Sequence, residues 1–383
     1  MMNSRLQLAI SAKFKALYHQ EPELYSAPGR INIIGEHADY NEGFVLPAAI
    51  DKRIYFAIGK NDEGKHRFYS YDLDVFFETN QLEITQNTEH WAKYIIGVLA
   101  QFDKLSLHFD IVFGGDIPAG AGLSSSAALE SGIAVAVNDF LGAGKTKFEL
   151  VKMAQKAEHE YAGVLCGIMD QYASVFGKEN QVIRLDCRSN THDYFPLNLQ
   201  DYSLILVDTK VKHSLASSEY NLRRQECERA VEYYQQIHPE VKSLRDLKLE
   251  NLELNKPDGT SYKRAKYIIG EFQRVIQATE ALEKDDLKTL GKLLYQTHDG
   301  LQHLYEVSCP ELDFLVDQTI EMDQVLGARM MGGGFGGCTL NLVHLEFVED
   351  FKSKIYQAYQ SEFDQSPEFY LVKIENGAGK FIH

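Results

Sequence analysis

The chain has 383 residues, of which 44% are hydrophobic and 25% charged, and its formal net charge at pH 7 is −16. This composition is ordinary for a globular protein, and the length suits one large domain or two. The acidic balance argues against a nucleic-acid or anionic-membrane surface, because both require a basic face. No segment approaches the roughly 20 apolar residues that span a bilayer, and residues 1–20 lack the apolar core of a signal peptide.

The sequence contains no motif typical of a structural metal site or of a disulfide framework. None of the five cysteines stands in a C-x-x-C pair, and the 13 histidines form no H-E-x-x-H motif. The sequence therefore favours a reduced, cytoplasmic enzyme. The cysteines are Cys166, Cys187, Cys227, Cys309 and Cys338.

A polar cluster follows the first expected helix (residues 1–20). Arg30, Glu36, His37 and Asp39 lie close together in a segment that also carries isoleucines. The isoleucines would bury part of the segment and leave a polar turn facing a cleft. There the carboxylates could accept from several hydroxyls of a polyhydroxylated ligand. A solvated loop tied by an Arg30–Glu36 pair is the alternative, and the density of polar types among isoleucines favours binding.

The next segments read as strands over 44–60 and 66–84 and a helix over 91–102 that begins at the only tryptophan, Trp91. A lone tryptophan is more often a core residue than a ligand-stacking one. Alternating residues 107–113 then predict a strand that leads into a glycine- and serine-rich stretch.

Residues 120–126, Gly-Ala-Gly-Leu-Ser-Ser-Ser, precede an expected helix over 127–141 that stops at Gly142. Strand, glycine turn and helix N-terminus together favour an anion, because the first N–H groups of a helix lack partners and glycine permits close approach. No Gly-Lys-[Ser/Thr] follows, so the stretch is not a Walker A loop. A serine N-cap after an ordinary glycine turn fits the same residues.

Two acidic residues follow in less specific surroundings. Thr146 to Glu149 has the pattern of a capping box and starts an expected helix that ends at Tyr161. Glu158 lies beside the apolar stripe of this helix, so it could reach a cleft or remain solvated. Asp170 stands among apolar residues, where a buried carboxylate needs partners or a task; a helix cap or a hydrogen-bonded structural aspartate fits equally.

The second half reads as strands over 181–186 and 202–207, a charged helix over 213–237 and further helices from 241 to about 300. Residues 332–337, Gly-Gly-Gly-Phe-Gly-Gly, then run into a strand. They imply backbone that lies close to a ligand or crosses another segment tightly. A last strand is expected over 369–374.

Three glycine-bearing motifs in this order and spacing resemble the GHMP family of small-molecule kinases, and within it the galactokinase branch, over nearly the whole chain. Residues 29–40 (G-R-x-N-x-I-G-E-H-x-D-Y) are similar to the galactokinase signature, 120–127 to the family's phosphate loop and 332–337 to its third motif. Gly167-x-x-Asp170-Gln171 and Ser218-Glu219-Tyr220 match two further positions.

The resemblance implies a mixed α/β (α+β) fold of two domains with the active site in the cleft between them. These would be an N-terminal ribosomal-protein-S5-like domain over 1–195 and a C-terminal ferredoxin-like domain over 196–383. It also implies ATP-dependent phosphorylation of the C1 hydroxyl of α-D-galactose by a monomer. Galactose and ATP would be the partners and Mg²⁺ the cofactor.

The resemblance assigns roles by position. Asp170 matches the catalytic base and Arg30 the adjacent cation. The matched sugar contacts are Glu36, His37, Ala38, Asp39, Gly167 and Tyr220. The matched ATP contacts are Gly120, Ala121, Gly122, Leu123, Ser124, Ser125, Ser126 and Trp91, which matches a position near the adenine. The matched Mg²⁺ ligands are Ser126 and Glu158.

Ser124 and Ser125 are expected to cap the helix or to touch phosphate. Without a Walker lysine, Mg²⁺, the helix end and Arg30 must carry the phosphate charge. A kinase for N-acetylgalactosamine, galacturonate or arabinose remains open, as does a non-catalytic galactose-sensing regulator, although the intact phosphate loop favours the enzyme. A mevalonate-type kinase would lack the Gly35-Glu36-His37-x-Asp39 cluster.

Overall fold

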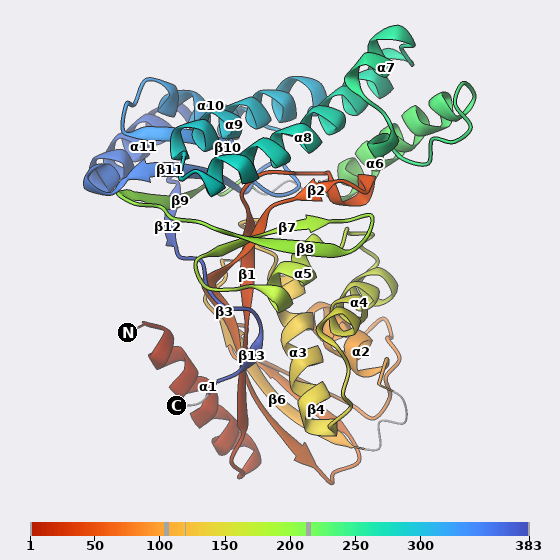
Figure 1. Cartoon of the computed structure of the whole chain (residues 1–383). Coiled ribbons are helices and arrows are strands. Elements are labelled where there is room, and N and C mark those ends of the chain that lie inside the picture. The colour runs from red at the N-terminus through yellow and green to blue at the C-terminus, as the bar shows by residue number, and fades with distance from the viewer. Residues whose placement is uncertain (1, 103–106, 119, 212–215, 382–383) are drawn as a thin grey trace.

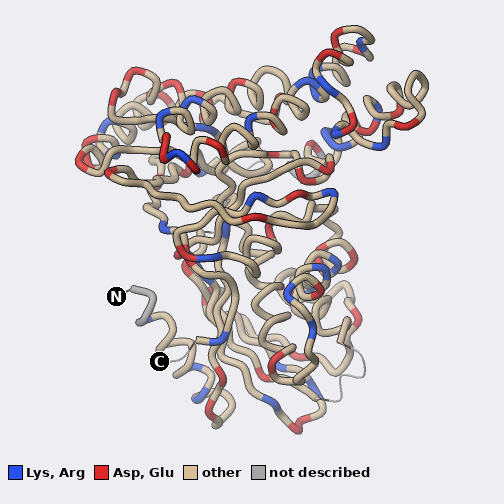
Figure 2. The backbone as a smooth tube through the Cα atoms, in the orientation of Figure 1, with Lys and Arg blue, Asp and Glu red and all other residues tan. Residues whose placement is uncertain are grey.

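The structure, a computed structural model, describes residues 2–102, 107–118, 120–211 and 216–381. It has two lobes, each built on its own sheet, with a smaller sheet between them (Figure 1). Figure 2 shows acidic and basic residues interspersed over both lobes. In the described part of the chain, no helix is long and apolar enough to cross a membrane.

The first lobe is built on a mixed six-stranded sheet. Its strands pair antiparallel except β4 and β6, which are parallel. In sheet order they are β13 (Gly379–Lys380), β1 (Glu23–Asn32), β3 (Pro47–Asn61), β6 (His108–Gly115), β4 (His66–Ser70) and β5 (Val75–Thr79). Because β13 pairs with β1, the last described residues return to the sheet that the first strand begins, and the two chain ends lie near each other in Figure 1.

Helices cover both faces of this sheet. On one face α1 (Met2–Tyr18) buries Ile10 and Phe14 against Tyr55 and Val112. The other face carries α2 (His90–Leu99), α3 (Ser125–Leu141), α4 (Lys147–Ala157), the π-helical turn η2 (Glu158–Ala162) and α5 (Met169–Phe176). Helix α3 lies against β1 and β3, which fixes its N-terminus next to β1.

The second lobe is built on an antiparallel sheet of β10 (Val325–Met330), β11 (Cys338–His344), β9 (Tyr202–Asp208) and β12 (Glu368–Val372), in that order. The sheet between the lobes comprises β2 (Phe44–Val45), β7 (Gln181–Asp186) and β8 (Thr191–Pro196). The helices of this half are α6 (Ala216–Gln235), α7 (Leu249–Leu254), α8 (Gly259–Glu283), α9 (Leu287–Gly300), the π-helical turn η4 (Leu301–Tyr305), α10 (Pro310–Ile320) and α11 (Val348–Phe363). The 3₁₀ turns are η1 (Asp39–Asn41), η3 (Leu244–Asp246) and η5 (Leu345–Phe347).

One hydrophobic core joins the two lobes. Ile31 and Leu46 of the first half pack in the same buried cluster as Leu204, Leu293 and Leu340 of the second. A shared apolar core holds the lobes in a fixed arrangement, so residues that they direct at each other meet in a defined geometry.

Most expected elements are confirmed, with local corrections. The strand expected over 66–84 is instead the hairpin of β4 and β5, and β8 was missed. The helix expected to end at Tyr161 changes to a π-helical turn at Glu158, although its capping box at Thr146 is confirmed. Residues 213–215 of the expected helix over 213–237 lie outside the described residues, as does the side chain of Ser218.

Candidate active site

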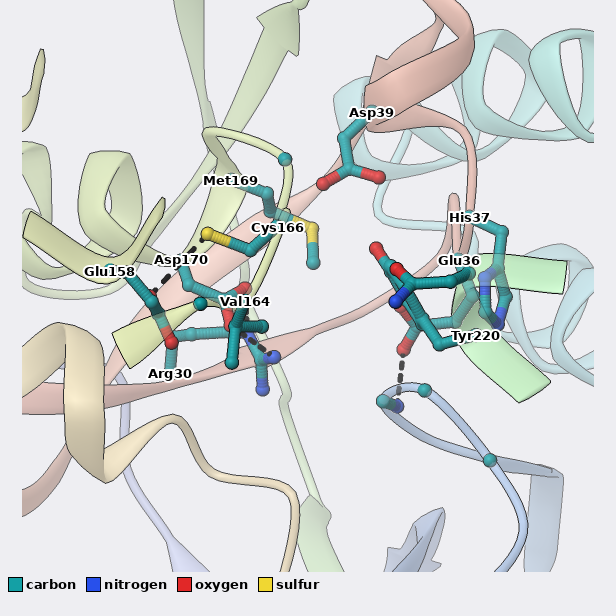
Figure 3. A pocket seen from close by; sticks show the side chains of 16 residues that line it. Arg30, Glu36, His37, Asp39, Glu158, Val164, Cys166, Met169, Asp170 and Tyr220 are labelled. Atoms are coloured by element: carbon teal, nitrogen blue, oxygen red, sulfur yellow. Dashed lines mark hydrogen bonds and ion pairs between the residues drawn. The ribbon is translucent and has the colours of Figure 1, made fainter. Parts of the chain in front are cut away.

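Both lobes line a cavity of about 290 Å³ (Figure 3). Arg30, Glu158 and Asp170 lie on one side of it, and His37 and Tyr220 on the other. The lining residues are Arg30, Glu36, His37, Asp39, Glu158, Gly163, Val164, Cys166, Gly167, Met169, Asp170, Tyr220, Asn221, Gly332, Gly333 and Gly334. The cavity thus brings the sequence's polar cluster, Asp170 and the glycine-rich motif together.

Arg30 and Asp170 form a bidentate ion pair at the cavity wall. The register of β1 shifts between Pro28 and Arg30, which re-aims the arginine. Gly29 is required there, because a Cβ would lie 2.7 Å from the Leu123 carbonyl oxygen. The Arg30 Nε donates to Asp170 Oδ1 at 2.7 Å and Nη2 to Oδ2 at 2.8 Å. Such fork-to-fork pairing fixes the orientation of the carboxylate as well as its charge.

Residues 120–126, the expected phosphate loop, lie directly against this pair. The Arg30 Nη1 donates to the Gly122 carbonyl at 2.5 Å, and the Ser124 hydroxyl donates to Asp170 Oδ2. Ser124 is the N-cap residue of α3, with a φ of 59°, but its side chain makes no cap hydrogen bond. The expected capping role of Ser124 is therefore wrong, because Asp170 takes up its hydroxyl.

The other residues of the loop 120–126 differ in how deeply they are buried. Ala121 and Leu123 are buried in the core that joins the lobes, so their side chains anchor the loop, and only its backbone could contact a ligand at these two positions. Ser125 is exposed at the first position of α3. The first N–H groups of this helix have no intrahelical partners and carry partial positive charge. Gly120 and Gly122 adopt φ values of 79° and 73°, which favour glycine.

Ser126 and Glu158 form the second polar group beside the loop. The Ser126 hydroxyl donates to Glu158 Oε1 at 2.9 Å, and Gln171 Nε2 donates to Glu158 Oε2 at 2.6 Å. Burial, and then the charge of Asp170, raise the pKa of Glu158. The alternative of a solvated Glu158 is wrong, since only 7% of the residue is exposed.

These residues fit a magnesium site. The described residues hold no group of three or more His, Cys, Asp or Glu side chains placed to bind a metal. Mg²⁺ needs no such cage, because it keeps several waters and is bound through one or two carboxylates together with substrate phosphates. A hydroxyl and a carboxylate 2.9 Å apart, next to a helix N-terminus that favours phosphate, match that donor set.

Glu36 connects the polar cluster to the glycine-rich motif. Its Oε1 accepts from Arg329 Nη2 at 3.0 Å and from the Gly332 N–H at 2.8 Å, and its Oε2 accepts from Asn32 Nδ2 at 3.0 Å. The alternative Arg30–Glu36 pair is wrong, because each residue pairs elsewhere. Arg329, which no sequence motif indicated, is fully buried and stands 293 positions from Glu36.

Asp39 enters the cavity opposite Gly167. A Cβ on Gly167 would lie 1.7 Å from Asp39 Oδ2, so glycine makes room for the carboxylate. Burial, and then the nearby charge of Asp170, raise the pKa of Asp39 to about 7. Its charge therefore changes near neutral pH.

His37 lies between two tyrosine rings. Its ring centroid is 5.3 Å from that of Tyr220 and 4.8 Å from that of Tyr305. Burial lowers the pKa of His37 to about 4, so the imidazole is neutral at pH 7. Tyr220 also borders the glycine-rich motif, since a Cβ on Gly333 would lie 3.5 Å from its ring.

Ala38, Trp91 and the loop 120–126 lie outside the cavity lining, although the loop adjoins the lining through Ser124 and Ser126. Ala38 is fully buried in the hydrophobic cluster behind the polar turn. Trp91 packs against Phe77 and Phe113 over the first sheet, with ring centroids 6.3 Å and 5.2 Å away. The sugar-contact role of Ala38 and the adenine-contact role of Trp91 stay predictions.

The fold and the site define a GHMP-type small-molecule kinase. The chain matches the family models "GHMP kinases N terminal domain" over residues 93–178, "GHMP kinases C terminal" over 278–360 and "Galactokinase galactose-binding signature" over 12–60. It is 43% identical over 357 residues to galactokinase of Thermotoga maritima, an alignment that covers 92% of this chain and 99% of the relative.

Solved structures agree with this class. The structure of Lactococcus lactis galactokinase complexed with galactose superposes with a TM-score of 0.92 and 33% identity, over 98% of this chain and 100% of that one. Methanococcus jannaschii mevalonate kinase shares the fold, with a TM-score of 0.66 and 18% identity over 93% of this chain and 99% of its own. The chain belongs to the galactokinase family.

Proposed function

We propose that this protein transfers the γ-phosphoryl group of ATP to the C1 hydroxyl of α-D-galactose, forming galactose 1-phosphate and ADP. The observation that carries the proposal is the Arg30–Asp170 pair in the cavity wall, which the N-terminus of α3 adjoins through Ser124. A sugar hydroxyl beside Asp170 lies next to the loop that favours phosphate. The galactokinase names of the relatives support galactose as the sugar.

The reaction needs alignment and charge neutralisation more than covalent help from the protein. Asp170 accepts the proton of the C1 hydroxyl as the oxygen forms a bond to the γ-phosphorus. The bond from that phosphorus to the bridging oxygen breaks, and ADP leaves. Arg30 holds the carboxylate in place and adds positive charge at the transferred group, while the N–H groups at the start of α3 stabilise the phosphates.

Mg²⁺ belongs to the same proposal. Ser126 and Glu158 would hold it, and the ion would neutralise phosphate charge that the protein, without a Walker lysine, leaves uncompensated. In the protein itself Glu158 is already oriented by the Ser126 hydroxyl and the Gln171 amide.

The sugar contacts and the division of labour between the two halves are also proposed. Residues 1–195 would supply the base, the phosphate loop and most sugar contacts, and residues 196–383 would add Tyr220 and the glycine-rich motif. Asp39, His37 and Tyr220 all line the cavity, which supports them as sugar contacts.

All five cysteines are free thiols, which supports a reducing compartment such as the cytoplasm. We propose a monomer, which size-exclusion chromatography with light scattering would test.

An ADP-release assay with the purified protein tests this function. The panel comprises galactose, glucose, N-acetylgalactosamine, galacturonate and arabinose, each with MgATP. We expect turnover with galactose and none with glucose. Preference for another sugar of the panel would replace the substrate. Galactose binding by calorimetry without turnover on any sugar would instead identify a sugar-sensing regulator.

A further inference from the structure

A buried chain of hydrogen bonds ends at His37. The His37 Nδ1 is 2.8 Å from the Tyr40 hydroxyl, which is 2.8 Å from the Tyr305 hydroxyl, which in turn is 3.3 Å from the Cys227 Sγ. His37 is 4% exposed, and Tyr305 and Cys227 are 0% and 1% exposed. The chain runs from the polar turn in the first half, through the end of η4, to α6.

The other ring nitrogen of His37, Nε2, is buried and makes no hydrogen bond of good geometry to the residues that the structure describes. The Gly333 backbone lies near the ring and partly opposes the fall of the pKa of His37 that burial causes. His37 nevertheless lines the cavity, and Figure 3 shows it beside Tyr220 and Glu36. Buried polar atoms in native proteins are normally satisfied, so an orphaned nitrogen at a cavity wall points to a ligand group as its partner.

The direction of the protons follows from the chemistry of the chain. The imidazole is neutral, so one ring nitrogen carries a proton and the other accepts. An unprotonated imidazole nitrogen is a much better acceptor than a phenol oxygen or a thiol sulfur, and a phenol O–H is a better donor than an imidazole N–H. The strongest arrangement therefore has Cys227 donating to Tyr305, Tyr305 to Tyr40, and Tyr40 to Nδ1. The proton of the ring then sits on Nε2.

A hydroxyl oxygen of a sugar bound in the cavity could accept a hydrogen bond from such a donor. Asp39 and Asp170 present carboxylates, which as anions only accept, whereas a sugar hydroxyl both donates and accepts. An N–H at Nε2 would satisfy the oxygen of a hydroxyl whose proton goes to a carboxylate. Because a neutral histidine keeps this N–H only in one tautomer, the tautomer decides whether Nε2 donates to the hydroxyl oxygen or competes with the carboxylates for the hydroxyl proton.

We propose that Tyr40 and Tyr305 are positioning residues that fix His37 in its Nε2-protonated tautomer, so that Nε2 donates to a hydroxyl oxygen of the bound sugar. This deepens the proposed function and rests on it for the identity of the sugar.

Tyr305 is itself held firmly, as a positioning residue must be. It ends the π-helical turn η4, and the Arg223 Nε donates to its carbonyl at 2.8 Å. The Tyr267 ring packs 4.8 Å from the Tyr305 ring. Turns of π-helix are uncommon and occur frequently at functional sites, where the extra residue re-aims a side chain.

Two Tyr→Phe variants test the proposal against a matched control. Tyr40→Phe removes the donor to Nδ1, and Tyr305→Phe removes the donor that orients Tyr40. Tyr359→Phe is the control, because Tyr359 is as buried and donates to the Thr209 carbonyl at 2.9 Å, away from the cavity. We expect the KM for the sugar to rise about three- to tenfold in Tyr40→Phe and less in Tyr305→Phe, the range for one lost hydrogen bond, with kcat nearly unchanged. The control should lower the melting temperature without changing KM.

Nitrogen-15 NMR of histidine-labelled protein gives a readout that needs no turnover. The ligand-free wild type should show His37 protonated on Nε2, and Tyr40→Phe should show a mixture of tautomers. Protonation on Nδ1 in the wild type, or unchanged KM in both site variants, would overturn the proposal. If the wild type fails to phosphorylate galactose, the proposed function falls, but the tautomer is still measured.

Discussion

Replacing Asp170 by asparagine separates catalysis from the structural role of its ion pair. The asparagine keeps the size of the side chain but cannot take the proton of the sugar hydroxyl. General base catalysis contributes about 10²- to 10⁴-fold, so kcat should fall by at least that much while galactose still binds. The remaining Arg30, phosphate loop and sugar contacts explain why binding should survive.

The same change also weakens the fold. One carboxylate oxygen becomes an NH₂ group that faces the Arg30 guanidinium in either orientation, and the Ser124 hydroxyl as well if it takes the place of Oδ2. Removing one partner of a buried ion pair costs 3–5 kcal/mol, and since 26% of the Asp170 side chain is exposed we expect about 1–3 kcal/mol here. A lowered melting temperature alone is therefore not a sign of lost catalysis.

A second arginine–aspartate pair in the first sheet provides the control. Arg67 donates to Asp110 through Nε at 2.6 Å and Nη2 at 2.8 Å, nearly the geometry of the Arg30–Asp170 pair. Asp110 is completely buried and also accepts from Gln20 and Asn61, so Asp110→Asn should destabilise the protein at least as much. It does not line the cavity, so kcat should stay near the wild-type value.

The assay measures ADP formation at saturating galactose and MgATP, galactose affinity by calorimetry and melting temperature for both variants. We expect the rate to fall only in Asp170→Asn and the melting temperature to fall in both. Near-normal turnover in Asp170→Asn would refute the base assignment. An equal loss of rate in Asp110→Asn would show that destabilisation, rather than a missing base, lowers the activity.

Three further predictions concern the metal and the sugar. Glu158→Gln keeps an acceptor for the Ser126 hydroxyl but loses the negative charge. The Mg²⁺ concentration that gives half the maximal rate should therefore rise roughly tenfold or more, with galactose affinity unchanged. An unchanged Mg²⁺ requirement would exclude Glu158 as a ligand of the ion. Burial raises the pKa of Asp39 to about 7, so the side chain becomes protonated below that pH and is no longer an anionic acceptor for a sugar hydroxyl. Galactose affinity should therefore fall as the pH drops below about 7, approaching tenfold per pH unit. Calorimetry at several pH values checks this, and Asp39→Asn should abolish the pH dependence. Gly167→Ala places a Cβ 1.7 Å from Asp39 Oδ2 and should raise the galactose KM at least about tenfold by displacing it; the control Gly259→Ala, where a Cβ meets nothing within 4 Å, should leave KM unchanged.

The sequence predicted those structural features that depend on residues close together along the chain. Helix α3 and its stop at Gly142, which has a φ of 56°, follow from local propensity and the left-handed preference of glycine. The Thr146 capping box follows from residues three positions apart. The polar turn with Glu36, His37 and Asp39 was selected because carboxylates amid isoleucines are unusual for an exposed loop. All three line the cavity.

The pairing of these residues could not be predicted, because it is decided by packing between distant segments. Proximity in the sequence favours a pair of Arg30 with Glu36, yet the bulge in β1 turns Arg30 toward Asp170, 140 positions away. Arg329 and Tyr305 carry no local signal of function, since an arginine in a strand and a tyrosine in a helical run are common. Packing between the two halves of the chain brings Arg329 to Glu36 and Tyr305 to His37.

Glu158 and Tyr305 show how packing and helix irregularity limit what periodicity predicts at this site. Each lies in a π-helical turn that continues an α-helix, η2 after α4 and η4 after α9. An α-helix advances about 100° per residue, so one extra residue in a turn displaces every following side chain from the stripe that a 3.6-residue pattern predicts. Glu158 is the first residue of its turn, so it keeps the place beside the apolar stripe that this period predicts. Its burial against Ser126 and Gln171 is decided by packing against α3 and α5. Tyr305, by contrast, ends its turn and follows the extra residue, so its direction toward the Tyr40 hydroxyl, behind His37, could not be predicted from that period.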